Sequence, residues 1–421
     1  MKKRLFSTVV MVLIIINSVF PVGAVSGKGT ENNPFRIGTA EELLLLADFP
    51  DCYFELESDI ELTGTWTPIE DFSGHFDGKG HTITVKAYKN VANCGFFGTL
   101  SGIVENLIIC GNDINLSPYD DKSNIGVIAG VCSGAIQGCK VTGKITFSAS
   151  FRNTINAGGI CGNLIGMIKQ CMNEATVSLV HKNNYPYDGD VRYGGIVYKN
   201  EEGSVVSDCI NLDDAISSSS SAYYSGIAAY NYGNIINCCS AGGKELYTST
   251  SKRGISGGTL SNCYFDKNLL NYDGYSTDYG IPKSTLAMKM EATFEGWDFD
   301  TVWAIDESEE NPINDGYPYL RCFYDDFTCP ITVSTISAVE NKLVLDTKIS
   351  DTSDTYVLHI ALYDSADRLC DYVIIPNSRQ LKDVFAVFDD DKNAEYAKIF
   401  TWSAQNVVEP VAVNETVTIV R

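Results

Sequence analysis

Histidine is scarce in this 421-residue chain, which contains only His75, His81, His181 and His359. None of them stands in an HExxH pattern, the arrangement that places two zinc ligands and a general base on one helix face. This absence excludes that kind of metallopeptidase site. His75, Asp77 and His81 are close in sequence, but a turn separates them, so we expect solvent-facing imidazoles rather than a metal site.

Other catalytic and cofactor motifs are also missing. The chain has no GxSxG nucleophile elbow and no CxxC pair that could supply zinc ligands. Residues 72–85, FSGHFDGKGHTITV, resemble a phosphate loop, but the first glycine stands one residue too close to Gly78-Lys79, and a β-branched run follows instead of a helix. We therefore predict no cofactor and no catalytic metal, and we interpret residues 77–80 as a turn between two strands.

Basic residues are outnumbered, with 31 Lys and Arg against 53 Asp and Glu, and the net charge is −22. Nucleic acid and anionic lipid repel such a chain, so we expect neither as a partner. Long apolar runs are missing after the N-terminus, where Lys2-Lys3-Arg4, an apolar run over 5–20 and Pro21-Val-Gly-Ala24 are typical of a secretory signal peptide. We expect cleavage after Ala24, an extracellular or cell-surface location, and no membrane insertion of the remaining chain.

Cysteine, in contrast, is abundant, with 14 residues. In stacked repeats, equivalent side chains run parallel about 4.8 Å apart, whereas a disulfide needs Cβ atoms about 3.8 Å apart and turned together. We therefore expect an internal ladder of reduced, buried thiols, with disulfides as the alternative. Five cysteines close successive similar segments and would form this ladder: Cys139, Cys171, Cys209, Cys238 and Cys263.

Similar segments repeat between residues 95 and 265. Each has a Gly–apolar–apolar strand, a tight turn, a second apolar strand, and a small polar residue before Cys or Leu, and Gly98, Gly130 and Gly162 recur every 32 residues. Such short strands bury their apolar faces only by stacking on their neighbours. The pattern predicts a right-handed parallel β-helix, with short capping helices after the capping box at 39–42 and near Ser284.

The pattern changes at residue 328. Residues 331–349, 356–375 and 398–420 alternate apolar and polar side chains between turns, as in a β-sandwich. We therefore predict an all-β chain: a signal peptide over 1–24, a parallel β-helix over 25–327, and an Ig-like or fibronectin-like sandwich over 328–421 that folds alone.

The repeated segments resemble the GLUG-repeat family, named for its Gly-Leu-any-Gly motif, which stands here as Gly95-Phe-Phe-Gly98 and Gly159-Ile-Cys-Gly162. Residues 57–83 resemble the segment that precedes those repeats, and residues 297–300 and 316–320 resemble the closing segment. Such repeats occur in bacterial surface and secreted proteins, including the non-catalytic part of IgA-specific metallopeptidases. The C-terminal region resembles a module of exported Gram-positive proteins. The resemblance implies an extracellular scaffold and by itself no activity.

Tyrosine is the surplus aromatic residue, with 23 copies. Exposed rings with polar neighbours suit sugars or protein partners, although tyrosines that brace loops are the ordinary alternative. We predict a non-catalytic, adhesin-like scaffold that binds neutral glycans or extracellular proteins, and we leave its oligomeric state open. The candidate ligand-binding residues are Tyr185, Tyr187, Tyr223, Tyr224, Tyr272 and Tyr275.

Polysaccharide cleavage is the alternative function. Parallel β-helices commonly host it, with two carboxylates or an acid and calcium in a long groove. The candidates for such a pair are Asp188, Asp190, Asp208 and Asp213, although nothing in their spacing selects two of them. Because a fold alone does not assign a function, we favour binding over catalysis.

Overall fold

The structure is a computed structural model. It describes residues 25–117, 119–120, 122–149, 154–181, 191–217, 222–243, 246, 251–271, 277–306 and 312–324, and seven strands between residues 331 and 420. The predicted signal peptide lies outside these residues, so its cleavage stays a prediction. None of the helices in the described part of the chain has the length and apolar character needed to span a bilayer.

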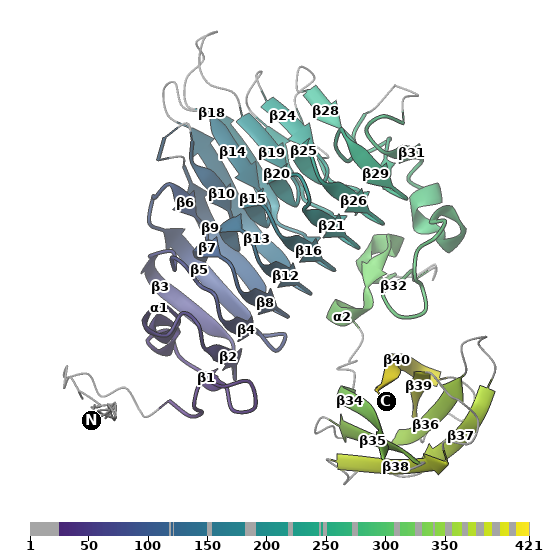
Figure 1. Ribbon diagram of the computed structural model, residues 1–421. Coiled ribbons are helices and arrows are strands. Elements are labelled where there is room, and N and C mark those ends of the chain that lie inside the picture. The colour runs from purple at the N-terminus through teal and green to yellow at the C-terminus, as the bar shows by residue number, and fades with distance from the viewer. Residues whose placement is uncertain are drawn as a thin grey trace, which may run out of the picture.

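A parallel β-helix extends from residue 35 to residue 283 (Figure 1). Its complete coils pass through four parallel sheets in turn, which we number 1 to 4, before the chain enters the next coil. Sheet 1 contains β6 (Asn93–Cys94), β10 (Asn124–Gly126), β14 (Ile155–Gly158), β19 (Val191–Gly194), β24 (Ala222–Ser225) and β28 (Ser251–Arg253). Sheet 2 contains β7 (Phe97–Leu100), β11 (Ala129–Cys132), β15 (Cys161–Leu164), β20 (Val197–Asn200) and β25 (Ala228–Asn231).

The other two sheets begin earlier in the chain and are longer. Sheet 3 contains β1 (Phe35–Ile37), β2 (Tyr53–Leu56), β4 (His75–Asp77), β8 (Ile103–Glu105), β12 (Ala135–Gln137), β16 (Met167–Lys169), β21 (Val205–Ser207), β26 (Asn234–Ile236) and β29 (Thr259–Ser261). Sheet 4 contains β3 (Ile60–Trp66), β5 (Thr82–Tyr88), β9 (Ile108–Leu116), β13 (Lys140–Ala149), β17 (Met172–Asn173), β18 (Thr176–His181), β22 (Ile210–Asn211), β23 (Ile216–Ser217), β27 (Cys239–Ser240), β30 (Tyr264–Asp266) and β31 (Ile281–Lys283).

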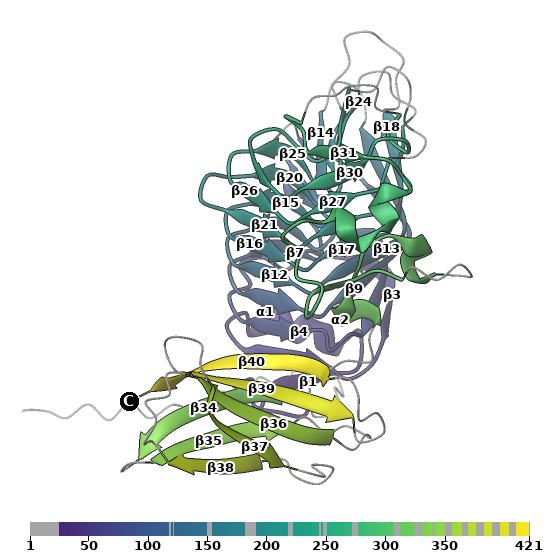
Figure 2. The ribbon, with the colours of Figure 1, turned by 90° about the vertical axis from the view of Figure 1, so that its right-hand side faces the viewer.

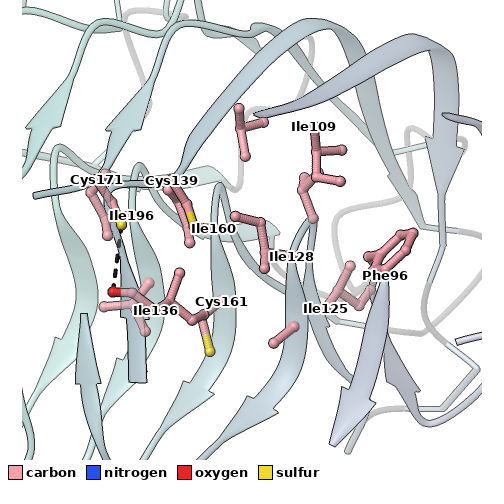
Figure 3. Close-up of a cluster of buried hydrophobic side chains, with 14 of the residues drawn as sticks. Phe96, Ile109, Ile125, Ile128, Ile136, Cys139, Ile160, Cys161, Cys171 and Ile196 are labelled. Atoms are coloured by element: carbon pink, nitrogen blue, oxygen red, sulfur yellow. Dashed lines mark hydrogen bonds between the residues drawn. The ribbon is translucent and has the colours of Figure 1, made fainter. Parts of the chain in front are cut away.

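Apolar side chains of equivalent positions stack inside the β-helix. Ile136 pairs with Val104 in the coil before it and with Ile168 in the coil after it, and all three are fully buried. Figure 3 shows the same stacking for Ile128 and Ile160. Since a single coil of short strands has no closed core, this stacking between coils creates the hydrophobic interior. The predicted parallel β-helix is confirmed.

The predicted thiol ladder lies in this interior, at the corner between sheets 3 and 4. Its five members, from Cys139 to Cys263, are at most 2 % exposed and are free thiols. Each Sγ donates to the carbonyl oxygen two residues earlier, at 3.1–3.2 Å. Cys171 Sγ also reaches Ile136 O of the preceding coil at 3.6 Å (Figure 3). The burial predicted for these cysteines is confirmed.

The corner before each ladder position requires an unusual backbone conformation. Residues 77–80 form this corner in an early coil, where Lys79 and Gly80 have φ values of 51° and 79°. The predicted turn is therefore confirmed, and it recurs in each later coil. Most of its positive-φ residues are of the types that tolerate this region best. They are Asn106, Gly138, Gln170, Asp208, Asn237 and Asn262.

A short helical segment closes the N-terminal end, as predicted. Thr39 Oγ1 accepts the Glu42 amide at 3.3 Å, and Glu42 Oε2 accepts the Thr39 amide at 3.0 Å, which is a capping box. The segment consists of η1 (Glu42–Leu44) and α1 (Leu45–Asp48), and its Leu43 and Leu46 are fully buried.

The segment after the last coil lies on the outer face of sheet 4, where Figure 2 shows it over β17 and β27. Its Phe294, Trp297 and Trp303 pack in one cluster with outward-facing Met172 and Ile210. The prediction places this second cap over the far end of the β-helix, whereas the segment packs against the outer face of sheet 4. Its elements are η2 (Ala287–Lys289), η3 (Glu291–Thr293), β32 (Trp303–Ala304), η4 (Ile313–Gly316), β33 (Tyr319–Leu320) and α2 (Arg321–Tyr324).

Seven strands follow, linked by pairings that are antiparallel except for one, so the predicted all-β character of this region is confirmed. β34 (Ile331–Val339), β35 (Lys342–Ile349) and β38 (Asp383–Asp389) form one antiparallel group. The other group contains β36 (Tyr356–Tyr363), β37 (Leu369–Ile375), β39 (Tyr396–Ser403) and β40 (Pro410–Val420). A short parallel pairing between β34 and β40 joins the two groups. All seven strands are therefore linked in one series of pairings, and the Ig-like or fibronectin-like sandwich stays a prediction.

Candidate functional site

Two rows of glycines line the junction between sheets 1 and 2. In sheet 1, Gly126, Gly158 and Gly194 are in register at the ends of successive strands. In sheet 2, the residues directly before and after each glycine pair between neighbouring strands. These pairings place Gly98, Gly130 and Gly162 in register. We call these rows the sheet-1 and sheet-2 glycine ladders.

The glycine ladders allow the backbones of the two sheets to touch. A Cβ atom at Gly130 would lie 2.7 Å from the carbonyl carbon of Asn93, and one at Gly162 would lie 2.8 Å from the amide nitrogen of Ile125. Both distances are shorter than real Cβ contacts, so a side chain at either position would push the sheets apart. Glycine is therefore required here for close approach.

Both ladders lose their glycines in the last coils. In sheet 1, Gly194 is followed in register by Ser225 and then by Arg253. In sheet 2, the corresponding places belong to Tyr198 and Ala229, and the sheet ends at β25, one coil before sheet 1 ends. Side chains now stand where the sheets touched.

A depression of about 70 Å³ lies at this point on the surface. We call it the ladder-end depression. Three residues that replace ladder glycines, Ser225, Ala229 and Arg253, line it together with their neighbours on β19, β24, β25 and β28. Its lining includes Arg192, Tyr223, Ser225, Tyr230, Ser251 and Arg253.

The two arginines are held by aromatic rings and by hydrogen bonds. The Arg192 guanidinium lies 5.9 Å from the centre of the Tyr230 ring and hydrogen-bonds Tyr198. Arg253 lies 5.2 Å from the centre of the Tyr279 ring, and its Nη1 donates to Ala229 O at 3.3 Å. No acidic residue is among the described residues that line the depression.

Aromatic side chains continue along the outer face of sheet 2. Tyr198 and Tyr230 meet edge to face with ring centres 5.6 Å apart. Tyr232 is 60 % exposed, and the Lys199 ammonium lies 5.6 Å from its ring centre. The same ammonium also pairs with Glu201 Oε1 at 2.6 Å, so the depression adjoins a surface of tyrosine rings and an ion pair.

The predicted ligand-binding tyrosines differ in their exposure to solvent. Tyr223 lines the depression and is 45 % exposed. Tyr224 is 1 % exposed, because successive side chains of a strand point to opposite faces, and its hydroxyl donates to Asp213 Oδ1 at 2.9 Å. Tyr224 also belongs to the lining of the depression, but so little of it is exposed that it offers almost no surface to a ligand. The remaining four candidates, Tyr185, Tyr187, Tyr272 and Tyr275, lie outside the described residues.

The sequence analysis did not select Arg192, Tyr230 or Arg253. Isolated arginines form no motif, and these residues come together only when the coils stack in register. One signal was nevertheless present, because the repeat loses its glycines in the segments that contain these residues.

Asp208 and Asp213, the two described carboxylates of the alternative function, do not form a surface pair. Asp208 is half-buried at the corner between sheets 3 and 4, where Asn237 Nδ2 donates to it at 3.3 Å. Asp213 is fully buried, so it shares no open groove with Asp208. Asp188 and Asp190 lie outside the described residues.

Asp213 belongs to a chain of polar groups inside the β-helix. Asn173 Nδ2 donates to Asn211 Oδ1 at 3.0 Å, and Asn211 Nδ2 donates to the Tyr224 hydroxyl at 3.0 Å. The Tyr224 hydroxyl in turn donates to Asp213. Burial raises the pKa of Asp213 to about 6. A carboxyl group so deep in the molecule is an internal structural group rather than a ligand contact.

The histidines of the early coils pair with carboxylates. His75 Nε2 lies 2.8 Å from Glu105 Oε1, and this hydrogen bond raises the pKa of His75 above its ordinary value. His81 Nδ1 lies 3.3 Å from Asp59 Oδ1. Across the part of the chain that the structure describes, no three His, Cys, Asp or Glu side chains gather as metal ligands would.

Comparisons with known proteins yield only distant likenesses. No family model matches the chain, and no curated protein matches it, so the resemblance to GLUG repeats stays a prediction. A crystal structure from Bacteroides ovatus, named for a proposed immunoglobulin A1 protease, is 21 % identical over 70 % of this chain and 94 % of its own, with a TM-score of 0.47. The enzymatically active domain of tailspike protein 4 from bacteriophage CBA120 is 12 % identical over 86 % of this chain and 64 % of its own, with a TM-score of 0.19. Both values are too low to carry an argument, so the fold assignment rests on the strand pairing alone.

Proposed function

We propose that the chain is a non-catalytic scaffold that binds glycans on the outer surface of its β-helix, outside the cell. The observation that carries this proposal is the ladder-end depression, which opens where the repeat loses its glycines. A recognition site of this kind sits on a rigid framework that the coils supply.

The residue types around the depression suit a saccharide. A tyrosine ring offers an apolar face to the C–H groups of a sugar, while its hydroxyl and nearby serines hydrogen-bond to sugar hydroxyls. Tyr223 and Tyr230 supply such rings, and Ser251 is exposed beside them. The depression holds a sugar substituent rather than a whole ring, so we expect weak single-site affinity that multivalent display raises.

A glycan array probed with the purified chain tests this proposal. We expect binding to a limited set of glycans, and we expect Tyr223→Ala or Tyr230→Ala to weaken the best interaction by about tenfold, the usual scale for a lost contact residue. Tyr119→Ala is the matched control, since Tyr119 is 65 % exposed and lies before β10, away from the depression. It should bind as the parent chain does.

Two results would contradict the proposal. If no glycan binds above the level of an unrelated acidic protein, the chain is not a glycan-binding scaffold. If new reducing or unsaturated ends appear on a polysaccharide panel, with or without calcium, the alternative of polysaccharide cleavage replaces it.

A further inference from the structure

We infer that a cleft between sheet 4 and the segment that covers it binds one neutral sugar ring of a glycan. We call it the sheet-4 cleft. The inference rests on the proposed function and adds a site to it, because the ladder-end depression has room for a substituent only. The cleft has a volume of about 300 Å³, against about 70 Å³ for the depression. Sites for small molecules commonly measure about 300–1,000 Å³.

The floor of the cleft comes from three successive coils. Glu174, Leu212 and Ala241 directly follow β17, β22 and β27, whose last residues pair in register, so the three stack in one column. Leu212 is half-buried and Ala241 is 3 % exposed. The floor is therefore apolar, with one carboxylate at its side.

The covering segment forms the opposite wall with Asn314, Asp315, Tyr317 and Tyr324. The Tyr317 hydroxyl donates to Asp266 Oδ2 of β30 at 2.8 Å, and the Tyr324 hydroxyl donates to Glu174 Oε1 at 2.7 Å. These bonds fix the wall against sheet 4 with the cleft between them. A cleft that is already formed loses little conformational freedom when a ligand binds, which favours affinity.

The backbone of this wall has an unusual conformation. Asn314, Asp315 and Gly316 have φ values of 54°, 53° and 79°, so three consecutive residues are left-handed. Residues with a side chain normally enter this region singly, because it costs energy. Such a cost is concentrated at ligand sites, where the surrounding structure maintains it. Here it places two polar side chains in the lining of the cleft, and the Asp315 side chain is 84 % exposed.

The polar groups of the lining are mostly hydrogen-bond acceptors. They are the carboxylates of Glu174 and Asp315 and the amide oxygen of Asn314, whose Nδ2 donates to Pro318 O at 2.7 Å. Sugar hydroxyls donate to such groups. Leu212 and the tyrosine rings offer apolar surface to the C–H groups of the same sugar ring.

Charge favours a neutral ring. Glu174 Oε2 lies 2.5 Å from Lys140 Nζ, and Asp315 Oδ2 lies 3.2 Å from Lys289 Nζ. Each carboxylate is therefore already paired, so a cationic ligand would compete with a lysine for it. The carboxylate of an acidic sugar would instead lie beside two carboxylates, and like charges repel. A neutral sugar meets neither cost.

The test is a calorimetric titration of the full chain with two matched series of methyl glycosides. One series is the glucoside, the glucuronide and the glucosaminide, and the other contains the three galactose counterparts. We expect the neutral member of at least one series to bind with a Kd of about 1 mM. It should bind more tightly than either charged member, and about tenfold more tightly than the acidic one.

Two variants place the bound sugar in the cleft. Asn314→Gly and Asp315→Asn should each weaken binding of the neutral sugar by about tenfold, the scale of a lost hydrogen bond to a ligand. Asp315→Asn should also narrow the difference between neutral and acidic members, since it removes a negative charge. Glycine and asparagine both tolerate left-handed backbone, so both variants should fold, which circular dichroism checks.

Asp113→Asn is the matched control for Asp315→Asn. Asp113 also has a left-handed backbone, with φ of 59°, and its carboxylate pairs with Lys144 Nζ at 2.9 Å. It lies on β9, two strands away from β17 in sheet 4. This variant should bind the neutral sugar as the parent chain does.

The possible failures are distinguishable. If Tyr223→Ala abolishes binding of the neutral sugar while the cleft variants leave it unchanged, the ring binds at the depression. The inference is then wrong and the proposed function stands, as it also does if no methyl glycoside binds but the glycan array is positive. If an acidic or amino sugar binds most tightly, the inference of a neutral ring is overturned. If no methyl glycoside binds and the array is also empty, both are wrong.

Discussion

The carboxyl group of Asp213 is fully buried, and its Oδ2 has no hydrogen-bond partner among the described residues. Its Oδ1 accepts from the Tyr224 hydroxyl and from the Gly243 amide. Burial raises its pKa from an ordinary 3.8 to about 6. The folded chain therefore holds this proton at pH values where the unfolded chain has released it. The stability associated with this group is complete below about pH 4 and is lost as the pH rises to about 6.

Asp213→Asn should remove this pH dependence. A pKa difference of about two units corresponds to about 3 kcal/mol, so the parent chain should lose about that much more unfolding free energy than the variant between pH 4 and pH 7. Urea denaturation at the two pH values measures the difference. Asp113→Asn is the control, because the Asp113 side chain is 66 % exposed and pairs with Lys144 at the surface. Equal pH dependence in the parent and in Asp213→Asn would contradict the assignment.

Individual site residues were predictable only in part. Tyr223 and Tyr224 are adjacent and chemically identical, yet Tyr223 is 45 % exposed at the depression and Tyr224 is 1 % exposed. Residue type cannot tell which of the two faces the surface, and only the strand register can. Arg192 and Arg253 are far apart in sequence, and coil stacking alone brings them together.

At the scale of the elements, the glycine ladders hold sheets 1 and 2 together. Gly130→Ala should destabilise the chain by about 2 kcal/mol, since its Cβ would overlap backbone atoms of Asn93 and an overpacked interior costs about 1–3 kcal/mol. Gly64→Ala is the matched control, because nothing lies within 4 Å of its added Cβ and its φ is not positive. It should change stability by less than about 0.5 kcal/mol. Thermal unfolding of both variants checks the expectation, and similar effects would show that the ladder positions are not constrained.

The repeated strands were predictable because each coil carries the same glycine, apolar and cysteine positions. The placement of the closing segment was not. Met172 and Ile210 are apolar, as a core residue is, yet they face outward beneath Phe294 and Trp297. The sequence does not distinguish an apolar residue in the interior from an apolar residue beneath a covering segment. The covered side of sheet 4 could therefore not be predicted.

At the scale of the whole molecule, the C-terminal strands form a closed set of pairings. Each strand from β34 to β40 pairs only with other members of this set in the described part of the chain. A fragment of residues 328–421 should therefore fold alone and unfold cooperatively in urea. A fragment of residues 25–327 should retain the glycan binding of the full chain. Gradual unfolding of the first fragment would argue against an independent domain.

The thiol ladder has a consequence for how the chain reaches its fold. Once the coils are stacked, the five sulfurs are buried away from solvent. Desolvation raises the pKa of Cys139, Cys209 and Cys263, whereas hydrogen bonds from neighbouring thiols lower the pKa of Cys171 and Cys238. Before stacking, all 14 cysteines are open to oxidation and disulfide exchange within seconds to hours. Contacts between coils join residues about thirty positions apart and form slowly. Successful refolding therefore requires the coils to stack before the cysteines are oxidised. A fold that uses no disulfide among its described residues still depends on a reductant while it forms.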